Sequence, residues 1–433
     1  MMKLQQLIAL YKKVHHVVID SRNIRKPALF FALKGEHYDA NQFAEEALNN
    51  GAVAAVVDDQ NIAVDQRYIL VDDALVALQR LAAEIRKEIN VPVIAITGSN
   101  GKTTTKELAD RVLAKKYHVS ATQGNLNNHI GVPLTILNAK RDSNLWIIEM
   151  GANHQGEIAT LCQIAQPNYG IITNLGNAHL QGFGSIEGVR IAKTELYRYL
   201  HEKSEDTVIF YNADDEILLP EVNRYNTKRW GYGSSNTADL KGNFTKANPF
   251  LQVTIEFFNT VRDIPTKLIG SYNLPNILAA ASFGTYFGVA PDEIANALSS
   301  YQPDNNRSQF IDTGKNIVVM DAYNANPSSV ELALDSFHSH EFNQKMVVLG
   351  DMLELGSDAH DYHRNIYNKV KEYGFDAIFV GPVYSDIVDK QRYPVFTDTK
   401  EASRFFIGKA FRNRSFLLKG SRGIGIEALL QYL

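Results

Sequence analysis

The stretch Val93–Glu107, VIAITGSNGKTTTKE, constrains the fold and chemistry of this chain more than any other. An apolar, β-branched run has the length of a buried strand, a turn with Gly98 and Gly101 follows, and a helix opens at Lys102 and Thr103. Backbone N–H groups in such a turn and the positive end of the helix bind anionic oxygens. We therefore expect a phosphate-binding loop, in which the lysine adds charge and the threonine hydroxyl can bind Mg²⁺.

The glycine spacing of this loop differs from the common P-loop, which has four residues between its two glycines. In that register Ile96 would stand where the first glycine belongs, so the loop has the shorter form TGxxGKT. An ordinary strand, turn and helix corner does not explain why Lys-Thr-Thr follows the second glycine. The strand, loop and helix signals together favour phosphate binding.

Length and composition bound the remaining possibilities. A chain of 433 residues is too long for one core and predicts about three domains. A net charge of -4 gives no argument for nucleic acid as a partner, and no apolar run reaches membrane-spanning length. The single cysteine, Cys162, excludes an intramolecular disulfide and fits a reducing cytoplasm. We expect a cytoplasmic monomer without membrane insertion.

The order of apolar runs and turn signals predicts an α/β fold with three domains. Residues 1–90 form a small α/β unit that ends at an Asn-Val-Pro break. Residues 91–303 alternate strands and helices as in a mostly parallel sheet, and residues 304–433 alternate again in a Rossmann-like manner. The last unit has no G-x-G-x-x-G after a strand, so its topology does not imply a dinucleotide cofactor.

Two further strands of the central unit end in polar residues. The run LWII ends at Glu149, and the run YGIIT is followed by Asn174 and His179. In an open α/β sheet ligands lie beyond the carboxyl ends of the strands, so these residues are expected beside Lys102 and Thr103. A carboxylate for Mg²⁺ with nearby donors for phosphates suits Mg-nucleotide chemistry. Alone, Glu149 could be a helix cap, and His179 could be structural.

Four other features have two interpretations from the residues alone. The amide-rich loop TQGNLNNHIGVP can bind polar groups or hold itself together, and the second interpretation is the simpler one. Lys193 can be a solvated helix lysine paired with Glu195. Asn273 and Asn276 share a helical face, where they could contact adenine or cap the helix. The triplet Asp20, Ser21 and Arg22 could grip a ligand or form a loop salt bridge.

Taken together, motifs spread over the whole chain resemble the Mur ligase family of ATP-dependent, amide-forming enzymes. They are TGSNGKTTTKE, GNLNNHIGVP, EMGANHQGEI, AHLQGFGS, DAYNANPSS, VLGDMLELG and KGSR, in that order. The loop TGxxGKT alone is also similar to folylpolyglutamate synthetase. EMGANHQGEI with DAYNANP and GDMLELG resembles the subfamily that adds D-alanyl-D-alanine to a UDP-N-acetylmuramoyl tripeptide, using ATP and Mg²⁺.

The resemblance implies a role for each residue of the predicted rim. Lys102 and Thr103 would hold the γ-phosphate and a first Mg²⁺, Glu149 would be a metal ligand, and His179 would help place a second ion. Lys193, in the family's AK(x)E position, would be carried as a carbamate. This implied role reverses the solvated interpretation, and it requires a neutral amine, which carbamylation converts into an anion that Mg²⁺ prefers.

The resemblance also implies which residues contact the substrates. Asn276 would contact adenine, and Arg307 and Asp321 would approach the ATP phosphates and ribose from the third domain. The loop residues implied in ATP binding are Gly98, Ser99, Asn100, Gly101, Lys102, Thr103 and Thr104. The residues implied in binding the UDP-linked substrate are Asp20, Ser21, Arg22, Asn125, Asn127 and Asn128.

The chain departs from the family at two positions. Tyr272 stands where the family often has histidine, and Met320 precedes Asp321 where paired aspartates are common. Both positions concern adenine and ribose, not phosphate or metal. The alternatives to the implied activity are a related ligase that adds a single amino acid and a non-catalytic nucleotide-binding switch or scaffold.

Overall fold

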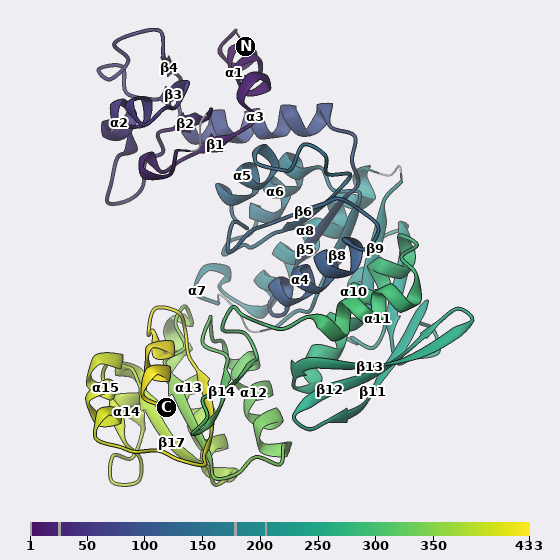
Figure 1. Ribbon diagram of the computed structural model, residues 1–433, viewed down its shortest axis with the longest axis vertical. Helices are drawn as coiled ribbons and strands as arrows, with labels where there is room; N and C mark the ends of the chain where they lie inside the picture. The colour runs from purple at the N-terminus through teal and green to yellow at the C-terminus, as the bar shows by residue number, and fades with distance from the viewer. Residues whose placement is uncertain (1, 25–26, 177–179, 204–205) are drawn as a thin grey trace.

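The computed structural model describes residues 2–24, 27–176, 180–203 and 206–433. These residues form three β-sheets with helices packed against them, which confirms the α/β fold class with three domains. Figure 1 shows the three units following one another along the longest axis of the molecule, from the N-terminal unit to the C-terminal one. The limits at residues 90/91 and 303/304 stay a prediction.

The N-terminal unit contains a parallel sheet in the order β1-β2-β3-β4. The segment 40–49 begins with a tight 3-10 turn, η2, at which the Asp39 side chain accepts from Asn41 N, and continues as the helix α2. The helix α3 spans Ala74–Glu88, and the Asp73 side chain caps it by accepting from Val76 N. The elements are α1 (Met2–Val14), β1 (Val17–Val18), η1 (Ser21–Asn23), β2 (Leu29–Phe31), η2 (Ala40–Phe43), α2 (Ala44–Asn49), β3 (Ala54–Val57), β4 (Tyr68–Leu70) and α3 (Ala74–Glu88).

The central unit contains a nine-stranded sheet in the order β13-β12-β11-β10-β9-β8-β5-β7-β6. Along this order, every pairing from β11 through β10, β9, β8, β5 and β7 to β6 is parallel. The pairings of β11 with β12 and of β12 with β13 are antiparallel and extend the sheet. The strands are β5 (Val93–Thr97), β6 (Val119–Ala121), β7 (Leu145–Glu149), β8 (Tyr169–Ile172), β9 (Val208–Asn212), β10 (Lys228–Gly233), β11 (Leu240–Ala247), β12 (Phe250–Phe257) and β13 (Thr260–Ile269).

Helices cover both faces of the central sheet. Alternate residues of β5 face opposite cores: Val93 and Ala95 pack on the side of α3, α5, α6 and α8, and Ile94 and Ile96 on the side of α4, α10 and α11. The first core also includes residues of α1, so the N-terminal and central units share it. The helices are α4 (Lys102–Leu113), α5 (Gly131–Leu137), α6 (Glu157–Ala165), α7 (Leu180–Phe183), α8 (Ile186–Lys203), α9 (Leu219–Asn223), η3 (Ser271–Asn273), α10 (Leu274–Tyr286) and α11 (Pro291–Ser300).

The C-terminal unit contains a six-stranded sheet in the order β14-β15-β19-β16-β17-β18, in which only the pairing of β14 with β15 is antiparallel. This is the Rossmann-like arrangement expected from the sequence. Its elements are β14 (Gln309–Asp312), β15 (Ile317–Met320), α12 (Pro327–Ser339), β16 (Lys345–Gly350), η4 (Gly356–Asp358), α13 (Ala359–Glu372), β17 (Asp376–Val380), α14 (Pro382–Ile387), β18 (Val395–Phe396), α15 (Thr399–Ile407), β19 (Ser415–Lys419) and η5 (Ile426–Tyr432).

The C-terminal unit contacts the central unit on two sides. Asn248 Nδ2 donates to Glu341 Oε2 at 2.7 Å near the antiparallel extension, and Gln181 N on α7 donates to Glu354 O at 3.1 Å. The two units are therefore joined at two separate places. Across the described ranges, none of the helices has both the length and the apolar character that crossing a membrane requires.

Candidate active site

The predicted phosphate loop lies between β5 and α4. Gly98 and Gly101 have φ values of +141° and +79°, which L residues rarely adopt. A Cβ on Gly98 would lie 2.0 Å from Thr173 Oγ1, and one on Gly101 would lie 2.4 Å from Asn276 Oδ1. The two glycines are thus required both by backbone conformation and by close packing.

Lys102 begins α4 and turns back over the loop. Its Nζ donates to Gly98 O at 2.7 Å and to Ser99 O at 3.2 Å. Burial lowers the pKa of its ammonium, Glu149 raises it and Arg307 lowers it further. The ammonium is thus held beside the loop with a second cation near it, an arrangement in which an anionic ligand lowers the repulsion.

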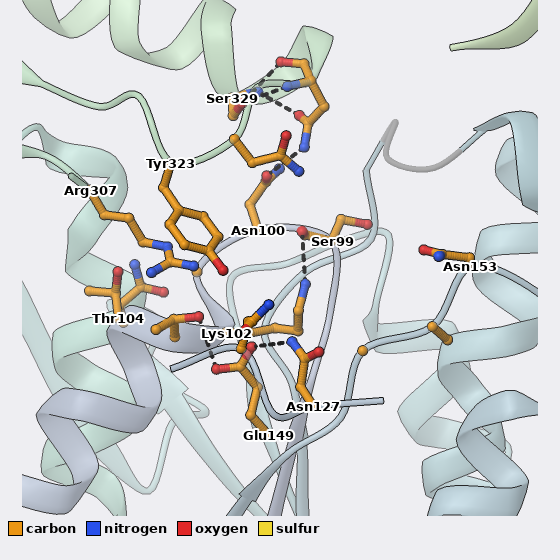
Figure 2. Close-up of a pocket in the computed structure, with 18 of the residues that line it drawn as sticks. Ser99, Asn100, Lys102, Thr104, Asn127, Glu149, Asn153, Arg307, Tyr323 and Ser329 are labelled. Carbon is orange, nitrogen blue, oxygen red and sulfur yellow. Dashed lines mark hydrogen bonds between the residues drawn. The ribbon is translucent and has the colours of Figure 1, made fainter. Parts of the chain in front are cut away.

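Glu149 lies at the end of β7 and is 1% exposed. Its Oε2 accepts from Thr103 Oγ1 at 2.9 Å and its Oε1 from Asn127 Nδ2 at 2.7 Å. Figure 2 shows Glu149, Lys102 and Asn127 side by side beneath the loop. A buried carboxylate with a threonine hydroxyl in hydrogen-bonding reach is the oxygen pair that the sequence predicted for Mg²⁺.

The oxygen ligands beside the phosphate loop suit Mg²⁺. Within the described residues no group of three or more His, Cys, Asp or Glu side chains could hold a metal. Mg²⁺, however, keeps several waters and uses one or two carboxylates together with substrate phosphates. Thr103 and Glu149 fit that mode of binding, because both face the cavity next to the phosphate loop. His179 lies outside the described residues.

The end of β8 supports the loop from the other side. Asn174 Oδ1 accepts from Asn100 N at 2.9 Å, its Nδ2 donates to Asn100 O at 3.2 Å, and Thr173 Oγ1 donates to Asn100 O at 2.6 Å. Ser99 Oγ in turn donates to Gly176 O at 2.9 Å. Asn174 therefore holds the backbone of the loop.

Lys193 lies on α8 and is 1% exposed, so the interpretation as a solvated lysine paired with Glu195 is wrong. Residues two apart on a helix do not face each other, and the Glu195 carboxylate accepts from Gly156 N and Ala159 N instead. Lys193 Nζ lies 5.4 Å from the centroid of the Phe183 ring. Burial, followed by the charge of Lys102, lowers the pKa of Lys193 to about 7.

The C-terminal unit supplies the opposite wall of the site. The Arg307 guanidinium stacks on Tyr323, with its Cζ 3.4 Å from the ring centroid, as Figure 2 shows. Asp321 Oδ1 accepts from Ser308 N at 3.1 Å, and its Oδ2 accepts from Lys419 Nζ at 2.5 Å. Asp321 is thus neutralised by a lysine within its own unit, whereas no ion pair holds Arg307 among the described residues.

Asn276 connects α10 to the helix that follows the loop. Its Oδ1 accepts from Thr105 Oγ1 at 3.1 Å and its Nδ2 donates to Asn273 Oδ1 at 2.9 Å. Asn273 stands at the N-cap of α10 without making a side-chain cap bond, and its Nδ2 donates to Ile269 O. The capping alternative is therefore wrong for this asparagine pair. Tyr272 Oη lies 2.9 Å from Ser308 Oγ, across the boundary between the two units.

The amide-rich loop both holds itself and faces the site. Asn128 Oδ1 accepts from Ile130 N and Gly131 N, which is a structural role, while Asn127 bonds Glu149. Asn125 faces the same cavity. Of these three asparagine side chains, only that of Asn128 therefore fits the simpler interpretation, in which the loop supports itself.

These residues surround one cavity of about 580 Å³ between the central and C-terminal units. Of the residues singled out from the sequence, it is lined by Ser99, Asn100, Gly101, Lys102, Thr103, Thr104, Asn125, Asn127, Asn128, Glu149, Tyr272, Asn273, Asn276, Arg307 and Asp321. Gly98 and Lys193 lie outside this lining. Asp20, Ser21 and Arg22 also lie outside it, and Asp20 forms the loop salt bridge with Arg22, with Nε 2.9 Å from Oδ1.

Sequence reasoning missed several residues of the cavity. Asn326 caps α12 in a capping box with Ser329, and its Nδ2 donates to Asn100 Oδ1 at 2.8 Å. This bond joins the C-terminal unit to the phosphate loop. The motif DAYNANPSS contains Asn326 just before Pro327, which is a helix-start signal that could have located it. Asn153, Tyr323 and Lys419 also line the cavity.

Comparison with known proteins identifies the family. Residues 13–86 match the Mur ligase family catalytic domain, residues 96–284 the Mur ligase middle domain, and residues 306–422 the Mur ligase glutamate ligase domain. The chain belongs to the Mur ligase family. The resemblance inferred from the motifs is thereby confirmed, and this Mur ligase is an enzyme of the ligase class.

Individual relatives match over nearly the whole chain. The UDP-N-acetylmuramoyl-tripeptide--D-alanyl-D-alanine ligase of Bacillus subtilis (strain 168) is 36% identical, over 97% of this chain and 93% of its own. A crystal structure of MurF from Acinetobacter baumannii has a TM-score of 0.86 at 28% identity, covering 99% of this chain and 97% of that one. MurF ligase from Thermotoga maritima in complex with ADP has a TM-score of 0.83 at 27% identity, covering 96% of each chain.

Proposed function

We propose that this Mur ligase joins D-alanyl-D-alanine to a UDP-N-acetylmuramoyl tripeptide while ATP is converted to ADP and phosphate. The observation that carries the proposal is the cavity in which Lys102, Glu149 and Arg307 come together from two units of the chain. The names and full-length match of the relatives support the choice of substrates. A switch or scaffold has no need of the amide loop and Lys193 beside a phosphate loop.

The reaction is expected to proceed in two steps. The terminal carboxylate of the tripeptide attacks the γ-phosphorus of ATP, so that a new P–O bond forms and the bond to ADP breaks, giving an acyl phosphate. The amine of D-alanyl-D-alanine then attacks the carbonyl carbon and loses a proton. Phosphate departs with the electrons of the C–O bond, and the amide remains.

The residues of the chain contribute charge and position in this scheme. Lys102 and the backbone of Ser99 to Thr104 bind the phosphates, and Arg307 approaches them from the C-terminal unit. Asn276 contacts adenine, and Asp321 lies toward the ribose. Thr103 and Glu149 would hold Mg²⁺, and His179 would help to hold a second ion; the metal would supply charge neutralisation at the phosphates.

The same proposal assigns the remaining candidates. Lys193 is carried as a carbamate, which its lowered pKa favours because only the neutral amine reacts with CO₂. Asn125, Asn127 and Asn128 face the peptide end of the UDP-linked substrate. Its uridine end is bound in the N-terminal unit by Asp20, Ser21 and Arg22.

Enclosure by two units suits this chemistry, because water would hydrolyse an acyl phosphate. The cavity is bounded on one side by the phosphate loop and on the other by Arg307 and Tyr323. We place the reaction in the cytoplasm and expect a monomer, which a mass measurement on the purified chain in solution would check.

Mass-detected ligation tests the proposal. Purified protein is incubated with ATP, Mg²⁺, D-alanyl-D-alanine and UDP-N-acetylmuramoyl tripeptides that carry either lysine or diaminopimelate, and with single amino acids in place of the dipeptide. A product formed only with the dipeptide is expected. A product with a single amino acid would indicate the related ligase instead, and ATP hydrolysis independent of both substrates would indicate a switch. Lys102→Ala is expected to lower turnover by about 10² to 10³.

A further inference from the structure

Glu107 is a carboxylate of α4 that the proposed chemistry does not use. It follows Thr103 by four residues, so both lie on one side of the helix, but Glu107 is not among the residues that line the cavity. Its Oε2 accepts from Tyr301 Oη at 2.7 Å, and both of its oxygens accept from Asn305 Nδ2 at 2.9 Å. Burial, followed by the charge of Glu107, raises the pKa of Tyr301, so that its hydroxyl stays protonated and donates.

The two donors belong to the linker between the central and C-terminal units. Tyr301 directly follows α11, and β14 begins at Gln309, so residues 301–308 form the whole connection. Glu107 therefore joins this linker to the helix that begins at the phosphate loop. Among the described residues, Asn305 Oδ1 is buried without a hydrogen-bond partner, so the amide is oriented by the bonds of its Nδ2 to the Glu107 carboxylate.

The linker determines where Arg307 reaches the cavity. Its neighbours Asn306 and Ser308 have φ values of +57° and +47°, conformations that cost L residues free energy unless tertiary contacts hold them. On the far side of Arg307, Ser308 is held by Asp321 and by Tyr272. On the near side, Asn306 O accepts from Tyr323 N at 3.2 Å, and the hydrogen bonds to Glu107 hold the preceding part of the linker at Tyr301 and Asn305.

We propose that Glu107 is a positioning residue of the ligation reaction, which holds the interdomain linker against the phosphate helix and thereby fixes Arg307 over the phosphate loop. The inference rests on the proposed function, because that function gives Arg307 its role at the ATP phosphates. A purely structural carboxylate would satisfy the same donors without affecting Arg307, and the experiments below separate the two.

The first experiment compares variants of Glu107 with a control. Glu107→Ala is expected to lower kcat about 10- to 100-fold, since small misplacement of a group that contacts the reacting phosphate has effects of that size. Glu107→Gln is expected to stay within about threefold of wild type, because its amide can accept from Tyr301 and donate to the unpartnered Asn305 Oδ1. Glu293→Ala, an exposed glutamate on α11, is the control and is expected to match wild type.

The second experiment is a double-mutant cycle between Glu107 and Arg307. If Glu107 acts through Arg307, Glu107→Ala has little further effect in the Arg307→Ala background. If the losses of kcat from Glu107→Ala and Arg307→Ala multiply in the double variant, and Glu107→Ala lowers the Tm with and without Arg307, the proposal is overturned. If Glu107→Ala does not fold, the cycle uses Tyr301→Phe with Asn305→Ala, which releases the linker from the other side, and the same criterion applies.

The same cycle is also measured on the affinity for a nonhydrolysable ATP analogue. This readout does not require ligation, so it judges the linker even if the wild-type protein forms no amide product. Failure to form the product would refute the proposed substrates, whereas additive effects of Glu107 and Arg307 on analogue affinity and on kcat would refute the positioning role alone.

Discussion

Replacement of Lys193 by methionine is expected to stabilise the central unit at neutral pH. Lys193 Nζ is buried on α8 and makes no hydrogen bond to the described residues; it lies 5.4 Å from the centroid of the Phe183 ring. Methionine has a similar length, fills irregular space and carries no charge to desolvate. The same change is expected to abolish ligation, because the carbamate can no longer form.

The magnitude follows from the shift of the lysine pKa from 10.5 to about 7. Between these pH values the unfolded chain binds more protons at this residue than the folded chain, so stability rises with pH. One pKa unit corresponds to about 1.4 kcal/mol, so the cost of the lysine is at most about 4 kcal/mol at pH 7 and about 2 kcal/mol at pH 9. It disappears above about pH 10.5 and is fully present below about pH 7.

Urea unfolding of both proteins at pH 7 and pH 9 measures this difference. The buffers are depleted of CO₂, because a carbamate on the wild-type lysine would remove the cation whose cost is being measured. Lys193→Met is expected to have the higher unfolding midpoint, by more at pH 7 than at pH 9. A midpoint equal to or below wild type at pH 7, or a difference independent of pH, would refute the inference that burial suppresses the charge of Lys193.

Three other predictions, one of them with a matched control substitution, have defined outcomes. Gly101→Ala is expected to weaken nucleotide binding at least about tenfold, as measured by calorimetric titration with ADP. The control is Gly124→Ala, since Gly124 has a φ of +54° and an added Cβ would meet no described atom within 4 Å; it is expected to cost only about 1 to 2 kcal/mol of stability. Glu149→Gln is expected to raise the Mg²⁺ concentration for half-maximal turnover about 10- to 100-fold, and an unchanged Mg²⁺ titration would remove Glu149 from the metal site. Arg86→Met is expected to lower the unfolding free energy by about 2 to 4 kcal/mol, because the Arg86 guanidinium donates to Ala165 O and Val91 O. The KM for ATP is expected to stay unchanged, and a changed KM would contradict this structural role.

Much of the fold could be predicted because the buried strands of a parallel sheet are short, continuous apolar runs between turn signals. The runs that begin at Val93 and Leu145 are observed as the strands Val93–Thr97 and Leu145–Glu149. The antiparallel strands β11 and β13 were harder to identify. Phe244 in β11 and Val261 in β13 are exposed although they are apolar, so apolar and polar residues do not alternate cleanly along these strands. Pro265 in β13 weakens the strand pattern in the sequence further.

The site was predicted unevenly for a physical reason. Lys102, Thr103 and Glu149 could be assigned to one rim, because the order of strand, loop and helix fixes which side of the sheet they occupy. The burial of Lys193 could not be derived from spacing, since it depends on Phe183 and on the packing of α8 against the sheet. The roles themselves stay predictions.

By itself, the sequence determined the local chemistry of this protein: a glycine turn that exposes backbone N–H groups, a lysine and a threonine at a helix start, and carboxylates at strand ends. These properties depend on residues close together in the chain. Only the tertiary structure decided which distant groups meet there, including Asn326 on Asn100 and Arg307 opposite Lys102. Such contacts depend on how whole units pack, which local sequence does not encode.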